Sequence, residues 1–132
     1  MYFLSTSLKE TETIAIKISK NIEVGDNICL TGEMGVGKTT LLSSLLQHRG
    51  FQNISSPTFT LAHYYENDNE RIVHYDLYRL ENQEIFGLED DLLDPHTTVF
   101  IEWSEKLAFR DFNKKSISIT KEQEQRIIHF LE

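Results

Sequence analysis

The sequence of 132 residues has a single cysteine, Cys29, so an intrachain disulfide is excluded. It has no apolar run that approaches the ~18 residues of a membrane-spanning helix. Its first segment, Met1 to Glu10, lacks both the basic start and the long apolar stretch of a secretion signal. We therefore expect a cytoplasmic protein without a membrane role, in which Cys29 is a small buried hydrophobic residue and not a redox centre.

Basic residues are also scarce. Lysine and arginine number 13 against 21 aspartates and glutamates, which gives a formal net charge of −8. Such a surface repels phosphate backbones over most of its area, so autonomous binding to nucleic acid is disfavoured. One local basic group, Lys106, Arg110, Lys114 and Lys115, is better explained as a solvated face. The length predicts one domain, residues 1–132, with room for a central sheet and its helices but little for a second substrate domain.

What the sequence does contain is a glycine-rich loop between an apolar strand and a helix. Residues 32–39 read G-E-M-G-V-G-K-T and match the full Walker A, or P-loop, pattern G-x-x-x-x-G-K-[ST]. The short strand Ile28–Leu30 precedes the loop. Leucines at helical spacing follow it, at Leu41, Leu42, Leu45 and Leu46. In such a loop consecutive backbone N–H groups wrap a phosphate chain, and the next helix points its positive end at the same anion.

The chemistry of phosphate binding gives these residues separate roles. Gly35 and Gly37 tolerate unusual backbone angles and a close approach of the ligand. Lys38 can reach the β- and γ-phosphates, and the Thr39 hydroxyl can bind Mg²⁺. The residues of this stretch that are expected to contact the nucleotide are Met34, Gly35, Val36, Gly37, Lys38, Thr39 and Thr40.

Two predicted strands end in an acid, and the two acids compete for the role beside Mg²⁺. Thr98–Trp103 has the general form of a Walker B strand, whose carboxylate, here Glu102, holds the magnesium shell. Arg71–Asp76 is the other strand, and carboxylates of nucleotide sites commonly lie at such strand ends. Because many strands end in an acid, it is the P-loop that makes Glu102 the leading assignment, with Asp76 as a competitor or a second member of the site. His74 lies on the face of Asp76 and is expected to be a structural hydrogen-bond partner.

The remaining pattern predicts an α/β chain. The first helix is expected to begin at a capping box formed by Ser7 and Glu10, although alternating isoleucines from Ile14 to Ile18 would also suit a strand. The buried face of this helix would carry Leu8, Thr11, Ala15, Ile18 and Ile22. Other helices are expected from the P-loop to about Gly50 and over Gln83–Leu93. Further strands are expected at Tyr2–Leu4, Ala62–Tyr65, Ser116–Thr120 and Gln125–Leu131.

Three further segments complete a distinctive pattern, namely S-P-T-F-T-L at 56–61, H-Y-D-L-Y-R-L at 74–80 and I-E-W at 101–103. Together with the P-loop, and in this order and spacing, they resemble the bacterial TsaE (YjeE) family across nearly the whole chain. Members of that family are small ATPases of tRNA threonylcarbamoyladenosine biosynthesis. The resemblance implies a P-loop α/β domain with a central mixed sheet flanked by helices, and ATP with Mg²⁺ as cofactors.

The resemblance also implies an activity and partners. The protein would hydrolyse ATP slowly by itself and would act with the transferase TsaD and its partner TsaB. It would meet tRNA only indirectly, through that complex. ATP hydrolysis would support N6-threonylcarbamoylation of adenosine 37 in tRNAs that read codons beginning with A.

Position by position, the resemblance assigns catalytic roles to Lys38, Asp76 and Glu102. Thr39 and Glu102 would hold Mg²⁺, directly or through water in the case of the carboxylate. Asp76 would orient the attacking water or support the metal site from outside its ligands. Thr11 matches a threonine of the first helix that lies near the nucleotide.

Other matches to the family are less defined. Thr58 and Thr60 fall in a loop that could sense the γ-phosphate, as in nucleotide switches, although an ordinary threonine-rich strand explains them as well. Trp103 would pack at the strand end or contact a partner. Ser104 stands where the family usually has proline, which affects the turn and not the carboxylate. Arg126 is the match to a late family arginine, and contacts to the adenine stay open.

Three alternative functions stay open. A small-molecule kinase needs a second substrate pocket and lid arginines, but the arginines of this chain are scattered, and Arg79 is only a weak internal candidate for a catalytic finger. A GTPase needs N-K-x-D, and here Asn113–Lys115 is followed by Ser116 in place of the aspartate. A non-enzymatic protein would use ATP as a conformational clamp for a partner, with hydrolysis incidental.

Overall fold

The computed structural model describes residues 1–33, 35–52, 61–78, 87–106 and 115–132. Its strands are β1 (Tyr2–Ser5), β2 (Asn27–Gly32), β3 (Ala62–Glu66), β4 (Arg71–Asp76), β5 (Thr97–Glu102), β6 (Lys115–Glu122) and β7 (Gln125–Leu131). Its helices are α1 (Leu8–Ser19), α2 (Lys38–His48) and α3 (Leu88–Leu93), with a 3₁₀ turn at Ser104–Lys106. Within the described ranges the strands form one sheet in the order β1-β7-β6-β2-β5-β4-β3.

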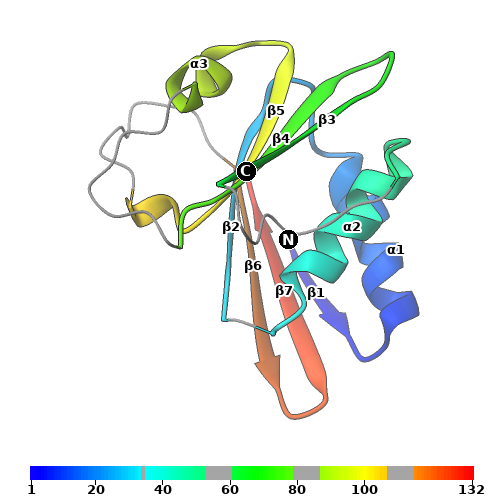
Figure 1. Cartoon of the computed structure of the whole chain (residues 1–132). Helices are drawn as coiled ribbons and strands as arrows, with labels where there is room; N and C mark the ends of the chain where they lie inside the picture. Colours follow the sequence, from blue (N-terminus) through cyan, green and yellow to red (C-terminus); the bar gives the residue numbers. More distant parts are fainter. Residues whose placement is uncertain (34, 53–60, 79–86, 107–114) are drawn as a thin grey trace.

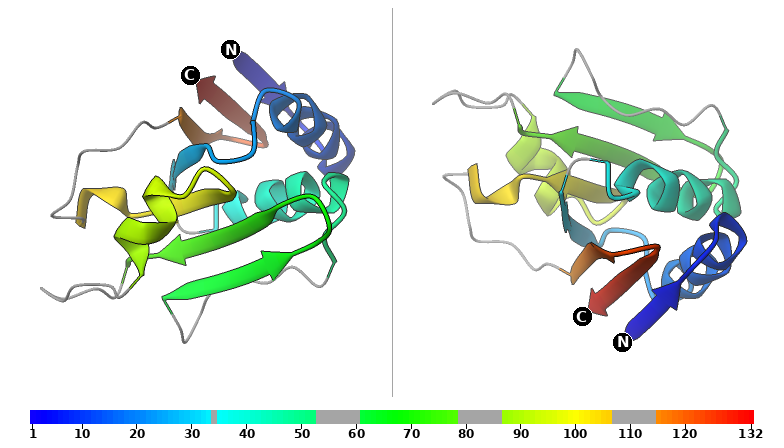
Figure 2. Two further views of the ribbon diagram at one scale, coloured as in Figure 1. Left: turned by 90° about the horizontal axis from the view of Figure 1, so that it is seen from above. Right: turned by 90° about the horizontal axis from the view of Figure 1, so that it is seen from below.

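The sheet is mixed and flanked by helices, which confirms the predicted α/β fold class. The central strand β2 pairs in parallel with β5 and β6, and β5 pairs in parallel with β4. The outer pairs β1–β7, β6–β7 and β3–β4 are antiparallel. Figure 1 shows α1 and α2 side by side, apart from α3, and the views in Figure 2 place α3 on the opposite side of the sheet. Because β2, β4 and β5 run in the same direction, the segments that follow them meet at one edge of the sheet.

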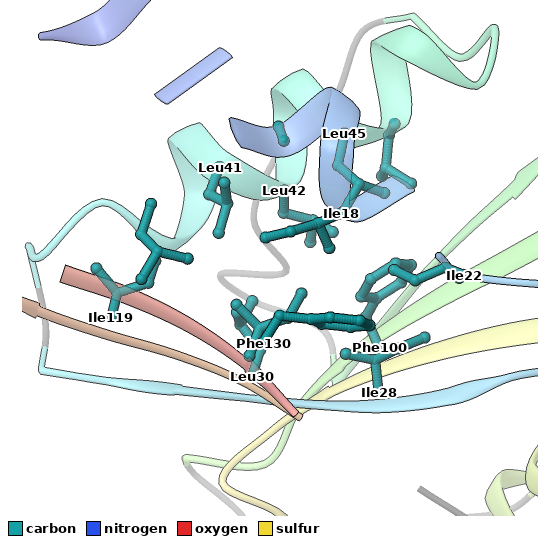
Figure 3. Packing of buried hydrophobic residues seen from close by; sticks show 14 of the residues in the cluster. Ile18, Ile22, Ile28, Leu30, Leu41, Leu42, Leu45, Phe100, Ile119 and Phe130 are labelled. Atoms are coloured by element: carbon teal, nitrogen blue, oxygen red, sulfur yellow. The ribbon is translucent and has the colours of Figure 1, made fainter. Parts of the chain in front are cut away.

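The larger hydrophobic cluster lies between the sheet and the pair α1–α2. Ile18 from α1 and Leu45 from α2 have no exposed surface, and burial of such a side chain stabilises the fold by about 1.5–3 kcal/mol. Figure 3 shows them above a layer of sheet residues that includes Ile28, Leu30, Phe100, Ile119 and Phe130. This packing fixes the axis of α2, and with it the position of Lys38 in the first turn of the helix, beside the end of β2.

Helix α1 begins as predicted at Ser7, whose Oγ accepts a hydrogen bond from the Glu10 N–H at 3.1 Å. The second half of the capping box is displaced by one residue, because the Glu10 carboxylate accepts from the backbone N–H and hydroxyl of Thr6 and not from the Ser7 N–H. The helix prediction is thus confirmed over the strand alternative. Leu8 was expected on the buried face but is 61% exposed, because it lies in the first turn, before the first buried helix position at Thr11.

Arg49, which follows α2, ties several elements together from the inside. Its guanidinium forms two hydrogen bonds with the Glu70 carboxylate, at 2.9 and 3.0 Å. It also donates to the carbonyl oxygens of Ser19 and Ile22, at 3.0 and 3.1 Å. The end of α2, the end of α1 and the β3–β4 hairpin are therefore held at one point. The sequence placed Arg49 in the last turn of the helix but gave no sign of these partners.

Helix α3 is anchored to the sheet by one buried acid. Asp91 is 6% exposed and accepts hydrogen bonds from Tyr75 at 2.5 Å, from Tyr64 at 3.0 Å and from Arg71 at 3.1 Å. Burial, and then the bond to Asp91, raise the pKa of the Tyr75 hydroxyl far above its usual value. Side chains of β3 and β4 thus donate three hydrogen bonds to the Asp91 carboxyl group, which holds α3 against these strands.

The outcome for the other predicted segments is mixed. The helix expected over Gln83–Leu93 is confirmed for Leu88–Leu93, while residues 79–86 lie outside the described ranges, as do Thr58 and Thr60. Cys29 is free and 5% exposed, as expected. Lys115, which was predicted to lie on a solvated basic face, forms an ion pair with Asp26, with 2.7 Å between Nζ and Oδ2. No helix in the described ranges is long and apolar enough to cross a membrane.

Candidate functional site

The glycine-rich loop connects β2, which ends at Gly32, to α2, which begins at Lys38. Gly37 caps the helix with a φ of 114°, and no side chain hydrogen-bonds at this cap. Among the described residues, no side chain therefore accepts a hydrogen bond from the amide groups at the start of the helix, and such a helix start can bind anions. At Gly32, whose φ is 154°, an added Cβ would lie 2.9 Å from the carbonyl oxygen of Ile119. Glycine is thus required at both ends of the loop.

Lys38, the first residue of α2, reaches back across the loop. Its ammonium nitrogen Nζ donates to the Gly32 carbonyl at 2.7 Å and lies 3.1 Å from Oε1 of Glu102. The same nitrogen lies 5.8 Å from the centroid of the Trp103 ring, within the range of a cation–π contact. The lysine of the P-loop pattern and the predicted Walker B acid therefore form one ion pair.

Glu102 ends β5 and is 5% exposed. Its second oxygen, Oε2, accepts a hydrogen bond at 2.7 Å from Nε2 of His74 on the neighbouring strand β4. Burial is the largest influence on this carboxyl and raises its pKa, but the hydrogen bonds and attraction from His74 and Lys38 together outweigh it. The pKa of Glu102 therefore lies below its usual value, and the group is a charged carboxylate although it is buried.

Asp76 ends β4 beside Glu102, since the two residues are register partners in the parallel pair. Its Oδ1 accepts a hydrogen bond from the Tyr78 N–H at 3.1 Å, and its own N–H donates to the Leu61 carbonyl at 2.9 Å. Because β4 and β5 are parallel and these residues are opposite each other, both acids lie at the same end of the sheet. Adjacent strands are ~4.8 Å apart, so the two residues are also close together. Among the contacts of the described residues, Glu102 alone of the two acids touches Lys38.

The other predicted loop residues differ in exposure. Thr39 and Thr40 are exposed in the first turn of α2, whereas Val36 is 5% exposed and belongs to the large core cluster. The Val36 carbonyl accepts a hydrogen bond at 2.7 Å from Nε of Arg126, in β7. Met34 lies outside the described residues. The late arginine thus contacts the backbone of the loop, and its contact with an adenine stays a prediction.

Thr11 has no described contact with Lys38 or Glu102. It is 6% exposed, and its Oγ1 lies 2.6 Å from Oγ of Ser5 and donates to the Ser7 carbonyl at 3.2 Å. These bonds join α1 to the end of β1. The predicted proximity of Thr11 to a nucleotide stays a prediction.

His74 is the residue that the sequence did not assign to the site. It was expected to be a structural hydrogen-bond partner on the face of Asp76, and the structure confirms a hydrogen-bonding role, with Glu102 as the partner. The H-x-D spacing at a strand end was the available signal, since residues two apart share a face of the sheet. The choice of partner could not be found in that spacing, because it depends on β5 being the parallel neighbour of β4.

Trp103 follows Glu102 with a φ of 63°, in the left-handed region that large residues rarely adopt. Its ring is tilted against Tyr78, with the centroids 5.2 Å apart, and it packs against the cluster beneath α3. The packing role expected of Trp103 is therefore confirmed, and its contact with a partner stays a prediction. Ser104, in place of the expected proline, begins the 3₁₀ turn.

The fold and the site define an α/β protein of the P-loop class. A parallel strand is followed by a loop of the G-x-x-x-x-G-K-[ST] pattern and a helix, and the loop lysine forms an ion pair with an acid at the end of the neighbouring strand. The family model described as threonylcarbamoyl adenosine biosynthesis protein TsaE matches residues 5–128. The chain therefore belongs to the TsaE family, as the sequence motifs predicted.

Individual relatives agree with this assignment. The tRNA threonylcarbamoyladenosine biosynthesis protein TsaE of Rickettsia typhi is 34% identical over 132 residues, which cover 88% of this chain and 92% of the relative. The protein of the same name from Aquifex aeolicus is 30% identical over 124 residues, or 86% and 90% of the two chains. That of Haemophilus influenzae is 43% identical over 83 residues, or 60% and 52%.

A solved structure supports the fold. The crystal structure of YdiB from Bacillus subtilis superimposes with a TM-score of 0.73 and covers 98% of this chain and 83% of that one. At 24% sequence identity, this similarity shows that the two chains share a fold, and it assigns no roles to individual residues.

Proposed function

We propose that this protein binds ATP with Mg²⁺ and hydrolyses it slowly to ADP and phosphate, in support of threonylcarbamoylation of adenosine 37 in tRNAs that read codons beginning with A. It would act in the cytoplasm with the TsaD–TsaB pair and meet tRNA only through that complex. The observation that carries the proposal is the ion pair between Lys38 and Glu102 beside the glycine-rich loop. Membership of the TsaE family supports the pathway.

The residues present fit a magnesium nucleotide. Gly35 has a φ of 77°, and apart from its chain neighbours no described residue has an atom within 4 Å of the place where its Cβ would stand, so the loop backbone there allows close approach. Carboxylate and hydroxyl oxygens, as on Glu102 and Thr39, are the kind of ligand that Mg²⁺ prefers. The bound ion would supply charge neutralisation for the phosphate oxygens.

The protein's own groups would divide the remaining work. The Lys38 side chain would move so that its ammonium group leaves Gly32 and Glu102 and contacts the β- and γ-phosphates. The amides of the loop and of the first turn of α2 would hold the phosphate chain. Oδ1 of Asp76 accepts a hydrogen bond from the Tyr78 N–H, and its other oxygen would orient the attacking water. Hydrolysis of this kind depends mostly on positioning and electrostatics. Among the described contacts no arginine touches Lys38 or Glu102, which is consistent with a slow enzyme that a partner group completes.

The first test is nucleotide binding and turnover by the purified chain. Binding of a fluorescent ADP analogue and release of phosphate from ATP are measured for the wild type, for Lys38→Ala and for Lys17→Ala, whose lysine is exposed on α1. Loss of a charge-assisted contact should weaken binding by Lys38→Ala roughly 10-fold or more, while Lys17→Ala should match the wild type. Equal binding and turnover by wild type and Lys38→Ala would contradict the proposal.

The same assay, repeated with the TsaD–TsaB pair and tRNA, separates the alternatives. Phosphate transferred to an acceptor other than water would indicate a kinase. Competition by GTP better than by ATP would indicate a GTPase. Repeated rounds of tRNA modification with a variant that binds but does not hydrolyse ATP would indicate a conformational clamp.

A further inference from the structure

His74 is the most deeply buried polar partner of the site, and the proposed mechanism above makes no use of it. The histidine is 1% exposed and Glu102 is 5% exposed, and the atoms Nε2 and Oε2 lie 2.7 Å apart. In register, His74 stands opposite Phe100, two residues before Glu102 on the parallel neighbour. The imidazole therefore leans along the sheet towards the end of β5, where the glutamate meets Lys38.

The direction of this hydrogen bond is fixed by chemistry. An ionised carboxylate only accepts, so Nε2 of His74 carries the proton and donates in either protonation state of the ring. The other ring nitrogen, Nδ1, is buried and has no hydrogen-bond partner among the described residues. Within the described part of the chain, the bond to Glu102 is thus the one polar contact that orients the ring.

The two oxygens of Glu102 consequently have different partners. Oε2 is bound by an imidazole ring that is buried within the sheet, and Oε1 faces the ammonium group at the end of the Lys38 side chain. If Lys38 moves to a phosphate, as the proposed function requires, Oε1 loses its partner while Oε2 keeps its own. A carboxylate held at one oxygen cannot rotate about its last bond without breaking that hydrogen bond.

We propose that His74 is a positioning residue that holds Oε2 of Glu102 while Oε1 exchanges the Lys38 ammonium for the magnesium shell of the bound nucleotide. This inference rests on the proposed function. It adds His74 to the site and gives Oε1 and Oε2 of Glu102 different roles. Groups that orient metal-binding carboxylates in this way typically change metal affinity by 10–100-fold when they are removed.

A matched pair of substitutions isolates the hydrogen bond from the volume of the ring. His74→Gln keeps an N–H donor near the position of Nε2, and His74→Met has a similar length and shape without a donor. Mg²⁺ is titrated against each protein with a fluorescent ADP analogue, and nucleotide affinity is also measured without the metal. We expect similar affinities without Mg²⁺ for all three proteins. The Mg²⁺ concentration for half-maximal effect should be near that of the wild type for His74→Gln and roughly 10-fold or more higher for His74→Met.

The outcomes are distinct. A His74→Met protein with the magnesium dependence of the wild type, or a His74→Gln protein as impaired as His74→Met, would overturn the positioning role while leaving the proposed function intact. A wild type that binds no ADP analogue would overturn the proposed function and this inference with it. If His74→Met does not fold, His74→Asn replaces it, because its amide nitrogen falls short of the carboxylate by about one bond; full magnesium affinity in that variant would likewise overturn the role.

The hydrogen bond can also be followed directly by NMR. The proton on Nε2 of His74, assigned by its loss in His74→Gln, should persist when the magnesium nucleotide is added to the wild type. Its disappearance on nucleotide binding would show that Oε2 is released and would overturn the proposal. Its persistence, together with a changed environment of the Lys38 ammonium, would support the exchange at Oε1.

Discussion

The Lys38 ammonium lies 3.1 Å from Oε1 of Glu102, although one residue begins α2 and the other ends β5. The side chains are only 10% and 6% exposed, so water screens this pair weakly. Removing one partner of such a pair leaves a buried charge without compensation. The two residues are therefore expected to depend on each other for stability as well as for chemistry.

A double-mutant cycle measures this dependence. Lys38→Met and Glu102→Gln should each lower the free energy of unfolding. We expect the sum of these two losses to exceed the loss in the double variant by about 1–2 kcal/mol, which is the coupling energy of the pair. His74 remains beside position 102 in every variant, so the coupling reports the contact with Lys38. Urea unfolding at pH 7 provides the four free energies, and strict additivity would show that the pair contributes nothing.

The exposed pair Arg71–Glu66 is the control for that cycle. Its atoms lie 3.5 Å apart, with side chains 36% and 71% exposed. Exposed ion pairs typically contribute less than about 1 kcal/mol. The same cycle at this pair should give a coupling well below that of Lys38 and Glu102.

Acid should remove the stabilising contribution of Glu102. The pKa of its carboxyl in the folded protein lies below the ordinary value of 4.5. A depressed folded-state pKa contributes stability that is fully present above the unfolded-state value and is lost as the pH falls through the folded-state value. The wild type should therefore lose more of its free energy of unfolding than Glu102→Gln as the pH falls below about 4.5. Parallel pH profiles of the two proteins, followed by urea unfolding, would contradict this.

Asp76→Asn separates hydrolysis from binding. Asparagine keeps an oxygen that can accept the Tyr78 N–H, so the turn after β4 and the fold should be preserved. The loss of a group that orients or activates water typically lowers turnover 10²–10⁴-fold. We expect phosphate release to fall by about that factor while binding of the ADP analogue changes little. Unchanged turnover would remove Asp76 from the mechanism, and lost binding would place it among the groups that hold the nucleotide.

The two glycines of the loop should respond differently to alanine. At Gly37, with a φ of 114°, an added Cβ would lie 3.2 Å from Nε of Arg126, the group that holds the Val36 carbonyl. At Gly35, with a φ of 77°, no described residue beyond the chain neighbours has an atom within 4 Å of the added Cβ, and the constraint that opposes the substitution is the left-handed conformation. We expect Gly35→Ala to cost about 1–2 kcal/mol and Gly37→Ala to cost more, as measured by urea unfolding. Equal costs would show that the contact with Arg126 adds no constraint.

The parts of the site that could be predicted are those encoded in consecutive residues. The spacing from Gly32 to Thr39 specifies the loop by itself, and the presence of that loop makes Glu102, at the end of an apolar strand, the leading candidate for the acid. The pairing of His74 with Glu102 could not be predicted, because it depends on which strands are neighbours and in which direction they run. The same holds for Arg126, whose partner Val36 is 90 positions away.

The error at Leu8 has the same origin. The helical period predicted that this residue lies on the buried face of α1, but the residue is 61% exposed. Periodicity gives the direction of a side chain around the helix axis and carries no information on how far along that axis the neighbouring layer extends. At the first turn of α1 the pattern alone therefore overstated the burial of Leu8.

The strand order has a consequence for how the chain matures. In the described sheet β1 pairs only with β7, and Arg126, which hydrogen-bonds to the glycine-rich loop, also belongs to β7. During synthesis β1 cannot pair with β7 until β7 has been made, and pairings between segments so distant along the chain form slowly. Until β7 has been made, a nascent chain would therefore lack the hydrogen bond between Arg126 and the glycine-rich loop.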